Sequence, residues 1–442
     1  MAQLSSIIMQ YIDASMVGRL GADDSASIGL MSSSLWLFWG VCSAATAGFS
    51  VQVAHRVGAA DYASARKIVA QGLSASFLFG MAVALIGLAI ARPLPHWLGG
   101  SEAVCGNATL YFAVFVGALP LLTLNYLGSG VLRAAGNMKV PGGLNVMMCA
   151  LDVVFNLFLI FPTREVDWLG FSFTIPGAGL GVLGAALGTV SAEVVTVALI
   201  LWYLLTRQEH IALRGREVSY RPTRPVIRNA VKVAAPMTLE HAVFAAAQIM
   251  ITIIVAPLGI MAIAANAFAV TAESLCYMPG FGIGDAATTL TGQSYGAGRP
   301  RLAKQFAYIT VGMGMAIMTV MGIILYIAAP AVMALMSPVE EICALGAEAL
   351  RIEAWAEPMY AASIVAYGAM VGVGDTILPA IMNFGSIWLV RIPLAAFLAP
   401  TMGLAGVWAA MCAELCFRGL IFLWRLRGGY WLRKGLHTAP LA

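Results

Sequence analysis

Charged residues are scarce in this sequence, and their scarcity limits the classes of protein that it can encode. Asp, Glu, Lys and Arg make up 10 % of the 442 residues, whereas soluble domains contain about 25 %. Apolar residues make up 60 %, and the mean hydropathy is +0.87. Apolar stretches long enough to cross about 30 Å of hydrocarbon follow one another along the chain. These features exclude a soluble globular protein and predict an all-α polytopic membrane protein.

Signatures of membrane-embedded hydrolases and of metal sites are also missing. The sequence has no H-E-x-x-H, no G-x-S-x-G and no C-x-x-C pair among its seven cysteines. The net charge of +4 is small and lies in loops, which argues against nucleic acid binding. The first apolar span has neither a charged leader nor an A-x-A site, so we expect no cleavable signal peptide. We therefore expect no enzyme, no cofactor and no metal site other than one for a coupling ion.

The chain contains an internal repeat. Leu20-Gly21 recurs as Leu258-Gly259, and Gly58-Ala59 recurs as Gly296-Ala297, both at an offset of 238 residues (259 − 21 and 296 − 58). The same offset relates three further pairs: Gly136 and Gly374, Pro141 and Pro379, and Asn145 and Asn383. Two copies of one unit of about 200 residues are the simplest explanation.

Twelve apolar spans can be drawn, six in each copy. They cover residues 1–18, 28–54, 68–90, 108–132, 142–161, 178–205, 231–256, 262–291, 305–329, 350–372, 378–398 and 403–424. The sequence thus predicts two pseudo-symmetric six-helix lobes, 1–205 and 233–424, joined by a basic linker, 206–232, and followed by a tail, 425–442.

Lys and Arg gather on alternate loops between these spans. Nineteen of the 25 lie on one side, among them seven in the linker and four in the tail, and only Arg19, Arg92 and Arg164 lie on the other. Basic loops stay in the cytoplasm, so we expect an inner-membrane protein with both termini cytoplasmic. The counterpart of Pro236, which follows a basic stretch, would fall upstream of Met1, so we expect a lead segment there.

Two acids in the first lobe, Asp13 and Asp152, lie within apolar spans. A charge at the centre of a membrane helix costs at least about 2.5–3.5 kcal/mol, so each needs a partner or a function. Low-dielectric surroundings and a second carboxylate nearby both disfavour ionisation, so such a pair can exchange a proton or, when ionised, bind sodium. The alternative for Asp13 is that it reaches solvent past Arg19 at the span end.

Several motifs, taken in order, resemble those of the multidrug and toxic compound extrusion (MATE) transporters of the bacterial, NorM- and DinF-like type. They are I-D-A-S-M-V-G-R-L-G in the first span, L-D-V-V-F-N in the fifth, and P-G-F-G-I-G-D-A-A-T-T-L-T-G-Q-S-Y-G-A-G-R-P around the eighth. The resemblance covers nearly the whole chain. It implies a MATE-like fold and antiport, in which a cation runs inward and an organic, often cationic, compound is expelled.

The resemblance also implies a cation-coupling site in the first lobe. Asp13 and Asp152 match the acids of the first and fifth helices, and Ala185 and Thr189 match a pair on the sixth that supplies a carbonyl and a hydroxyl. Many relatives have asparagine four residues before the second acid, where this chain has Met148; we expect Asn156, one turn later, to substitute. A thioether is a poor sodium ligand, which favours H+ over Na+ as the coupling ion.

The second lobe has acids of its own. Adding 238 to the positions of the first pair gives Ile251 and Val390, so the repeat does not duplicate its chemistry. Glu240 resembles the seventh-helix glutamate of bacterial relatives, and Glu273 lies inside the eighth span, which makes both candidates for substrate or cation binding. The alternative for Glu240 is an ion pair with His241 or a neighbouring helix.

Structural roles are expected for the remaining intramembrane charges. Arg391 needs an acidic partner, and Glu193 and Glu414 lie near span middles. Glu353 and Glu357 are four residues apart on one helix face. We expect these two to pair with Arg351.

The most consistent function is therefore a cation-coupled antiporter that works by alternating access. Its expected partners are small organic substrates and the lipid bilayer, with no nucleic acid, and the chain is expected to act as a monomer. The alternative is a flippase for a lipid-linked precursor, because such proteins have a related helical scaffold; its pyrophosphate headgroup would need a cationic cavity, whereas the buried charges here are mostly acidic.

Overall fold

The computed structural model describes residues 9, 12, 13, 15–18, 20–168, 171–214 and 218–433. Most of the predicted first span and Arg19 lie outside the described residues, although Asp13 lies within them. Linker residues 215–217 and the tail beyond Arg433 also lie outside.

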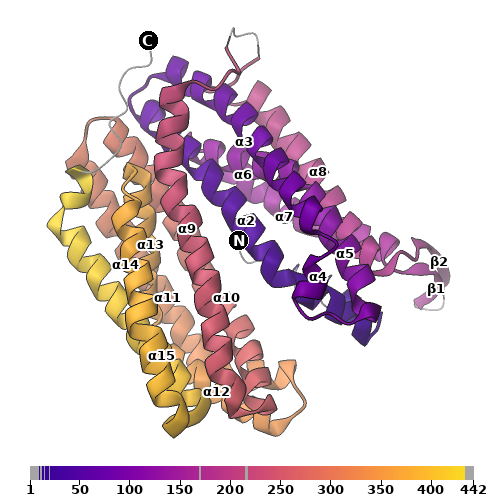
Figure 1. Ribbon diagram of the computed structural model, residues 1–442. Coiled ribbons are helices and arrows are strands. Elements are labelled where there is room, and N and C mark those ends of the chain that lie inside the picture. Colours follow the sequence, from indigo (N-terminus) through magenta and orange to yellow (C-terminus); the bar gives the residue numbers. More distant parts are fainter. Residues whose placement is uncertain are drawn as a thin grey trace. The chain divides into compact units, whose positions relative to one another are not determined.

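Contacts within the chain define two compact units. Unit 1 comprises Met1–Val53 and Tyr62–Ala230, and unit 2 comprises Ala54–Asp61 and Val231–Ala442. Both are built from long helices, which Figure 1 colours from indigo to magenta in unit 1 and, apart from the short stretch Ala54–Asp61, from rose to yellow in unit 2.

The helices of unit 1 include two that form one bent span. α5 and α6 meet at Ala118, next to Pro120, at an angle of 44°. Between α7 and α8 the chain forms an antiparallel β-hairpin, which the sequence analysis did not predict. The elements are α2 (Ala22–Gly58), α3 (Tyr62–Ile90), α4 (Leu94–Trp97), α5 (Glu102–Gly117), α6 (Leu119–Ala134), α7 (Lys139–Leu159), β1 (Pro162–Trp168), β2 (Phe171–Ala178) and α8 (Gly181–Thr206).

Unit 2 contains two departures from regular α-helix that matter below. A π-helical turn precedes α15, and α15 itself has a break at Gly403, whose φ of 60° and ψ of −139° suit glycine. The elements are α9 (Arg224–Val255), η1 (Ala256–Leu258), α10 (Ile260–Gly296), α11 (Pro300–Met336), α12 (Glu340–Glu353), α13 (Glu357–Val373), α14 (Ile377–Ser386), η2 (Ile387–Arg391), α15 (Ile392–Gly428) and η3 (Tyr430–Arg433).

Within the described ranges, eight helical stretches are long and apolar enough to cross a membrane, and the bent pair α5–α6 makes a ninth. One of the eight, Ile377–Gly428, contains both predicted spans 378–398 and 403–424, which meet near Gly403. The predicted tenth span corresponds to the end of α12 and to α13, which are separated by a short break before Pro358.

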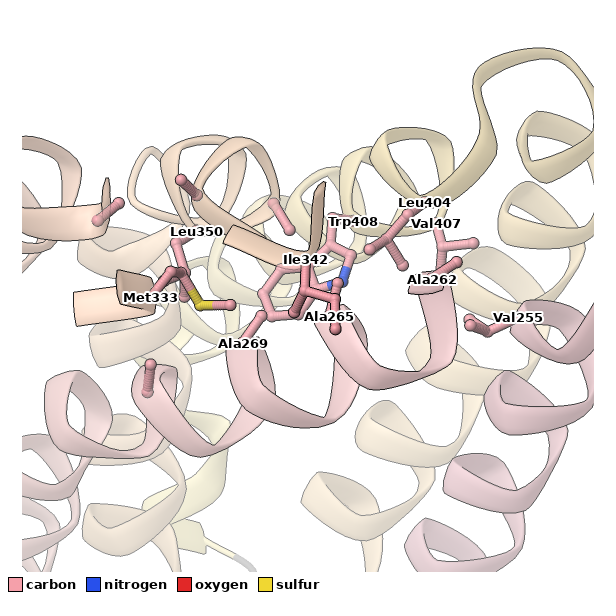
Figure 2. Packing of buried hydrophobic residues seen from close by; sticks show 14 of the residues in the cluster. Val255, Ala262, Ala265, Ala269, Met333, Ile342, Leu350, Leu404, Val407 and Trp408 are labelled. Atoms are coloured by element: carbon pink, nitrogen blue, oxygen red, sulfur yellow. The ribbon is translucent and has the colours of Figure 1, made fainter. Parts of the chain in front are cut away.

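The core of unit 2 packs many alanines against larger apolar side chains (Figure 2). The fully buried Trp408 ring of α15 lies against alanines of α10, including Ala265 and Ala269, in a cluster that also contains Leu350 of α12. Its indole N–H donates to Asn266 Oδ1 at 3.0 Å, so the one polar atom of this side chain is satisfied inside the core.

Two glycines of the repeat allow helix ends to cross at backbone contact. A Cβ on Gly58 would lie 1.9 Å from Gln293 O, and one on Gly296 would lie 2.0 Å from His55 O. His55 and Gln293 are themselves 238 residues apart (293 − 55), so the two contacts are related by the repeat. Close backbone approach therefore explains why these repeated positions are glycine.

α10 and α13 approach each other in the same way. Thr288 Oγ1 donates to Gly368 O at 2.8 Å, and Thr291 Oγ1 donates to Ala369 O at 2.9 Å. Interhelical hydrogen bonds of this kind need closely spaced backbones, which small residues permit.

We predict that Gly368→Ala lowers the thermal unfolding midpoint of the detergent-solubilised protein. The new Cβ would lie 2.5 Å from Gly284 O, and overpacking of this kind costs about 1–3 kcal/mol. Gly282→Ala, at a position on α10 with nothing within 4 Å, is the matched control and should not lower the midpoint, because alanine also favours the helix. Equal midpoints for the two variants would contradict the proposed packing.

Candidate functional site

Three side chains of unit 1 form a hydrogen-bonded cluster centred on Asn156. Asp152 and Asn156 lie one turn apart on α7 and are fully buried. The Asn156 amide nitrogen donates to Asp13 Oδ1 at 2.9 Å and to Asp152 Oδ2 at 3.2 Å. The two carboxyl groups also interact electrostatically with each other. One amide thus links two acids that are 139 positions apart in the sequence (152 − 13).

α8 completes this cluster because a glycine lets it approach α7. A Cβ on Gly188 would lie 2.0 Å from Asn156 Oδ1. Ala185 and Thr189 flank this glycine on α8. The Thr189 hydroxyl donates to Ala185 O at 3.2 Å and lies near the Asp152 carboxyl. The structure therefore brings together all five residues that the sequence analysis singled out in the first lobe.

The cluster offers oxygen atoms and little else to an ion. Asp152 Oδ1 and Asn156 Oδ1 are buried and accept no hydrogen bond from the described part of the chain. A proton can be shared between two adjacent carboxyl groups, and a sodium ion can be bound by carboxylate, amide and hydroxyl oxygens. Across the described ranges no group of three or more His, Cys, Asp or Glu could hold a metal ion.

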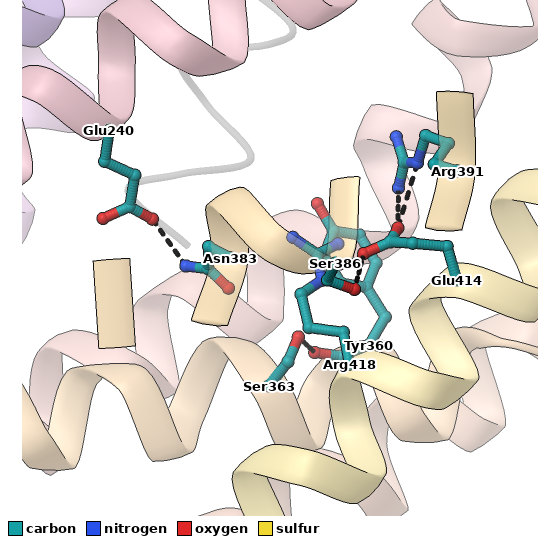
Figure 3. A network of polar contacts seen from close by, with 8 residues as sticks. All are labelled: Glu240, Tyr360, Ser363, Asn383, Ser386, Arg391, Glu414 and Arg418. Atoms are coloured by element: carbon teal, nitrogen blue, oxygen red, sulfur yellow. Dashed lines mark hydrogen bonds and ion pairs between the residues drawn. The ribbon is translucent and has the colours of Figure 1, made fainter. Parts of the chain in front are cut away.

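In unit 2, Glu240 of α9 lies between α13 and α14. The Tyr367 hydroxyl donates to Glu240 Oε2 at 2.5 Å. The Asn383 amide donates to Oε1 at 2.5 Å, as Figure 3 shows. Both oxygens are thus occupied by neutral donors. In the residues that the structure describes, Glu240 has no ion pair with His241. The sequence marked Asn383 only as a repeated position, and it gave no indication that Tyr367 would bind Glu240.

Arg391 and Glu414 form the central ion pair of this lobe. Arg391 donates to Glu414 Oε2 through Nε at 2.9 Å and through Nη2 at 2.6 Å. Arg418 lies 3.2 Å from Oε1, and the Ser386 hydroxyl donates to the same oxygen at 2.5 Å (Figure 3). Glu414 is therefore the acidic partner that Arg391 needed.

Three further acids surround this pair. Glu273 of α10, Glu353 of α12 and Glu357 of α13 are buried and interact electrostatically with one another. The carboxylate oxygens of Glu353 and Glu357 accept no hydrogen bond from any described residue. Counting Glu414, four carboxyl groups and two guanidinium groups, those of Arg391 and Arg418, gather in this part of unit 2.

The predicted pairing of Glu353 and Glu357 with Arg351 is wrong. Arg351 is exposed, and its Nε donates to Tyr326 O at 3.4 Å. Residues two apart on a helix do not share a face, so Glu353 points into the core where Arg351 points outward. The break between α12 and α13 then separates Glu357 from both.

A cavity of about 110 Å³ lies beside the ion pair. Its charged lining residues are Glu273, Arg391 and Arg418, and Tyr277 and Tyr360 also line it. The Arg418 guanidinium lies 5.3 Å from the centre of the Tyr360 ring, a cation–π contact. A volume of this size holds several water molecules, so the charged groups of unit 2 have room for proton carriers.

The family comparison gives an independent view of the repeat. The family model described as MatE matches residues 1–158 and 236–397. The two matched stretches begin 235 residues apart (236 − 1), close to the offset of 238 residues that relates the repeated motifs.

Individual relatives cover almost the whole chain. The probable multidrug resistance protein NorM of Thermotoga maritima is 25% identical over 96% of this chain and 89% of its own length. A solved MATE structure in complex with MaL6 is 20% identical, has a TM-score of 0.88, and covers 98% of this chain and 94% of its own. A MOP superfamily transporter from Pyrococcus furiosus has a TM-score of 0.87 and is 20% identical, with coverage of 98% of this chain and 94% of its own. Its binding pocket is described as having reverse polarity, which suggests a different function for that protein. These likenesses confirm the predicted helical multi-span fold.

We predict that Arg391→Met destabilises the protein by about 3–5 kcal/mol, because it leaves a buried carboxylate with half of its positive partners. The double variant Arg391→Met/Glu414→Leu should lose less than the sum of the two single variants, as measured by unfolding in detergent. Arg301→Met, an exposed arginine on α11, is the control. Strict additivity would show that the pair is energetically unimportant.

Proposed function

Because the chain belongs to the MatE family of membrane transporters, and is thus a multi-pass membrane protein and no enzyme, we propose that it is a multidrug efflux antiporter. A cation, H+ in preference to Na+, runs inward and drives the export of organic, often cationic, compounds. The protein works in the inner membrane as a monomer, with both termini cytoplasmic and with lobes 1–205 and 233–424 joined by the linker 206–232. The relatives named as multidrug resistance proteins support the class of substrate.

The observation that carries the proposal is the bridge from Asn156 to Asp13 and Asp152. Two adjacent ionised carboxylates repel each other, whereas one proton between them removes the repulsion and adds a hydrogen bond. Binding and release of the cation thus change the force between the segment that carries Asp13 and α7. In alternating access, this change favours one arrangement of the unit 1 helices.

Proton coupling is favoured by the small number of free ligands at this cluster. Asn156 already donates to one oxygen of each acid, and Met148 stands where many relatives have an amide. A shared proton needs no further oxygen, whereas a hard cation requires several oxygen ligands at once.

In unit 2, Glu240 and Glu273 are proposed to bind substrate or cation. Four carboxyl groups share two guanidinium groups around Arg391, so two carboxyl charges remain to be balanced by protons or by a cationic ligand. A surplus of acid suits a cationic substrate. It does not suit a pyrophosphate headgroup, which weighs against a flippase for a lipid-linked precursor.

We predict that Asp13→Asn/Asp152→Asn abolishes the efflux of ethidium driven by an imposed proton gradient. Neutral amides cannot exchange a proton, so substrate export loses its driving force. Fluorescence of ethidium in cells would be followed under proton and sodium gradients imposed separately, with the exposed acid variant Asp23→Asn as control. Efflux that survives in the double variant with its gradient dependence intact would refute the coupling site, and no efflux by the wild type under either gradient would favour the flippase.

We further predict that Gly188→Ala reduces proton-driven efflux about tenfold or more. The added methyl group displaces the Asn156 amide, and hydrogen bonds to charged groups are worth about 1.5–3 kcal/mol. Gly143→Ala on α7, where nothing lies within 4 Å, is the matched control. A folded Gly188→Ala protein with normal efflux would show that the bridge is not needed for coupling.

A further inference from the structure

A second, larger cavity of unit 2 is lined by exposed as well as buried residues. It has a volume of about 940 Å³ and is bounded by α11, α12 and α15. Its floor is apolar and made of small side chains, including Ala347 of α12 and Ala409 and Ala413 of α15. α12 lies at the lower end of unit 2 in Figure 1.

Two aromatic rings line this cavity, and both are of residue types that are common at a membrane interface. Tyr326 lies three residues before the end of the predicted span 305–329, and Trp355 five residues after the start of the predicted span 350–372. The rings are in edge contact, 6.1 Å apart, and Trp355 is 73% exposed. Trp and Tyr are enriched where lipid headgroups meet the hydrocarbon.

The charged groups of the cavity lie along one face of α12. Glu340, Glu348 and Arg351 line it, and their spacings of eight and three residues place them on one helix face. Glu341 and Glu353 of the same helix do not line it. The cavity therefore has a charged side and an apolar floor.

The charged groups Glu348 and Arg351 are exposed and form no ion pair with each other. Neither Glu348 nor Arg351 makes an ion pair within the described ranges, although they lie three residues apart. The guanidinium lies 5.7 Å from the centre of the Tyr326 ring, and only its Nε is engaged, with Tyr326 O. Its terminal nitrogens remain able to bind a phosphate, and the carboxylate is able to bind an ammonium group.

We propose that this cavity binds a zwitterionic phospholipid with a primary amine headgroup. Arg351 holds the phosphate, Glu348 holds the ammonium group two carbons away, and the alanine floor receives the start of an acyl chain. Charge complementarity selects this ligand: the guanidinium disfavours a simple organic cation, and the carboxylates disfavour an anionic lipid. The rings of Tyr326 and Trp355 cover the glycerol region.

The test is native mass spectrometry of the detergent-solubilised protein titrated with phosphatidylethanolamine, phosphatidylcholine or phosphatidylglycerol. The wild type should retain phosphatidylethanolamine in preference to the other two. Arg351→Gln should lower its retention about tenfold, the equivalent of one charge-assisted hydrogen bond. Glu348→Gln should remove the preference over phosphatidylglycerol, because only the ammonium contact is lost.

Glu341→Gln is the matched control, since this exposed acid lies on α12 outside the cavity. It should bind phosphatidylethanolamine like the wild type. Equal retention by Arg351→Gln and Glu341→Gln, with both proteins folded by thermal unfolding, would overturn the proposal. Displacement of the lipid from the wild-type protein by ethidium would overturn it as well, and would identify the cavity as a peripheral site for organic cations. Both readouts are independent of efflux.

Discussion

Every charged group inside this membrane protein depends on partners within the protein, because the hydrocarbon layer supplies neither water nor counter-ions. The structure meets this constraint in two ways. In unit 1, a neutral amide, Asn156, donates to both acids. In unit 2, guanidinium groups balance one carboxylate fully and leave others uncompensated. The groups that lack a full set of partners are the ones that can respond to an ion or a substrate, since fully paired groups gain no further interaction from binding it.

Small residues make these polar contacts geometrically available. Asn156 can reach between two acids because Gly188 lets α8 lie against it, and Thr288 can bond the backbone of α13 because Gly368 lets α10 approach. Packing and chemistry are thus coupled: a methyl group added at either glycine moves a hydrogen-bonding group as well as a helix. Movements that separate these helices would break the same hydrogen bonds.

The sequence predicted the helical membrane fold, the repeat and the residues that meet in unit 1. Apolar spans and isolated acids are strong signals, because insertion into a membrane allows few alternatives. It did not predict the β-hairpin Pro162–Ala178, which lies outside the apolar spans. Nor did it predict that Tyr367 and Asn383 would hold Glu240, because contacts between distant helices leave no mark in one sequence. The error over Arg351 had two causes: Glu353, two residues away, lies on another face of α12, and Glu357 lies beyond the break between α12 and α13.

The π-helical turn Ile387–Arg391 explains how the repeat gave the two units opposite charges at one place. At an offset of 238, Asp152 corresponds to Val390, but a π-turn inserts one residue and rotates the following side chains by one position. From its last residue onward the buried positions follow an offset of 239: Asp152 and Asn156 correspond to Arg391 and Ala395, all of which are buried. An aspartate in unit 1 and an arginine in unit 2 therefore occupy equivalent core positions. The arginine requires the carboxylate of Glu414, whereas the aspartate requires a proton, a cation or an amide, so the same scaffold carries two different electrostatic sites.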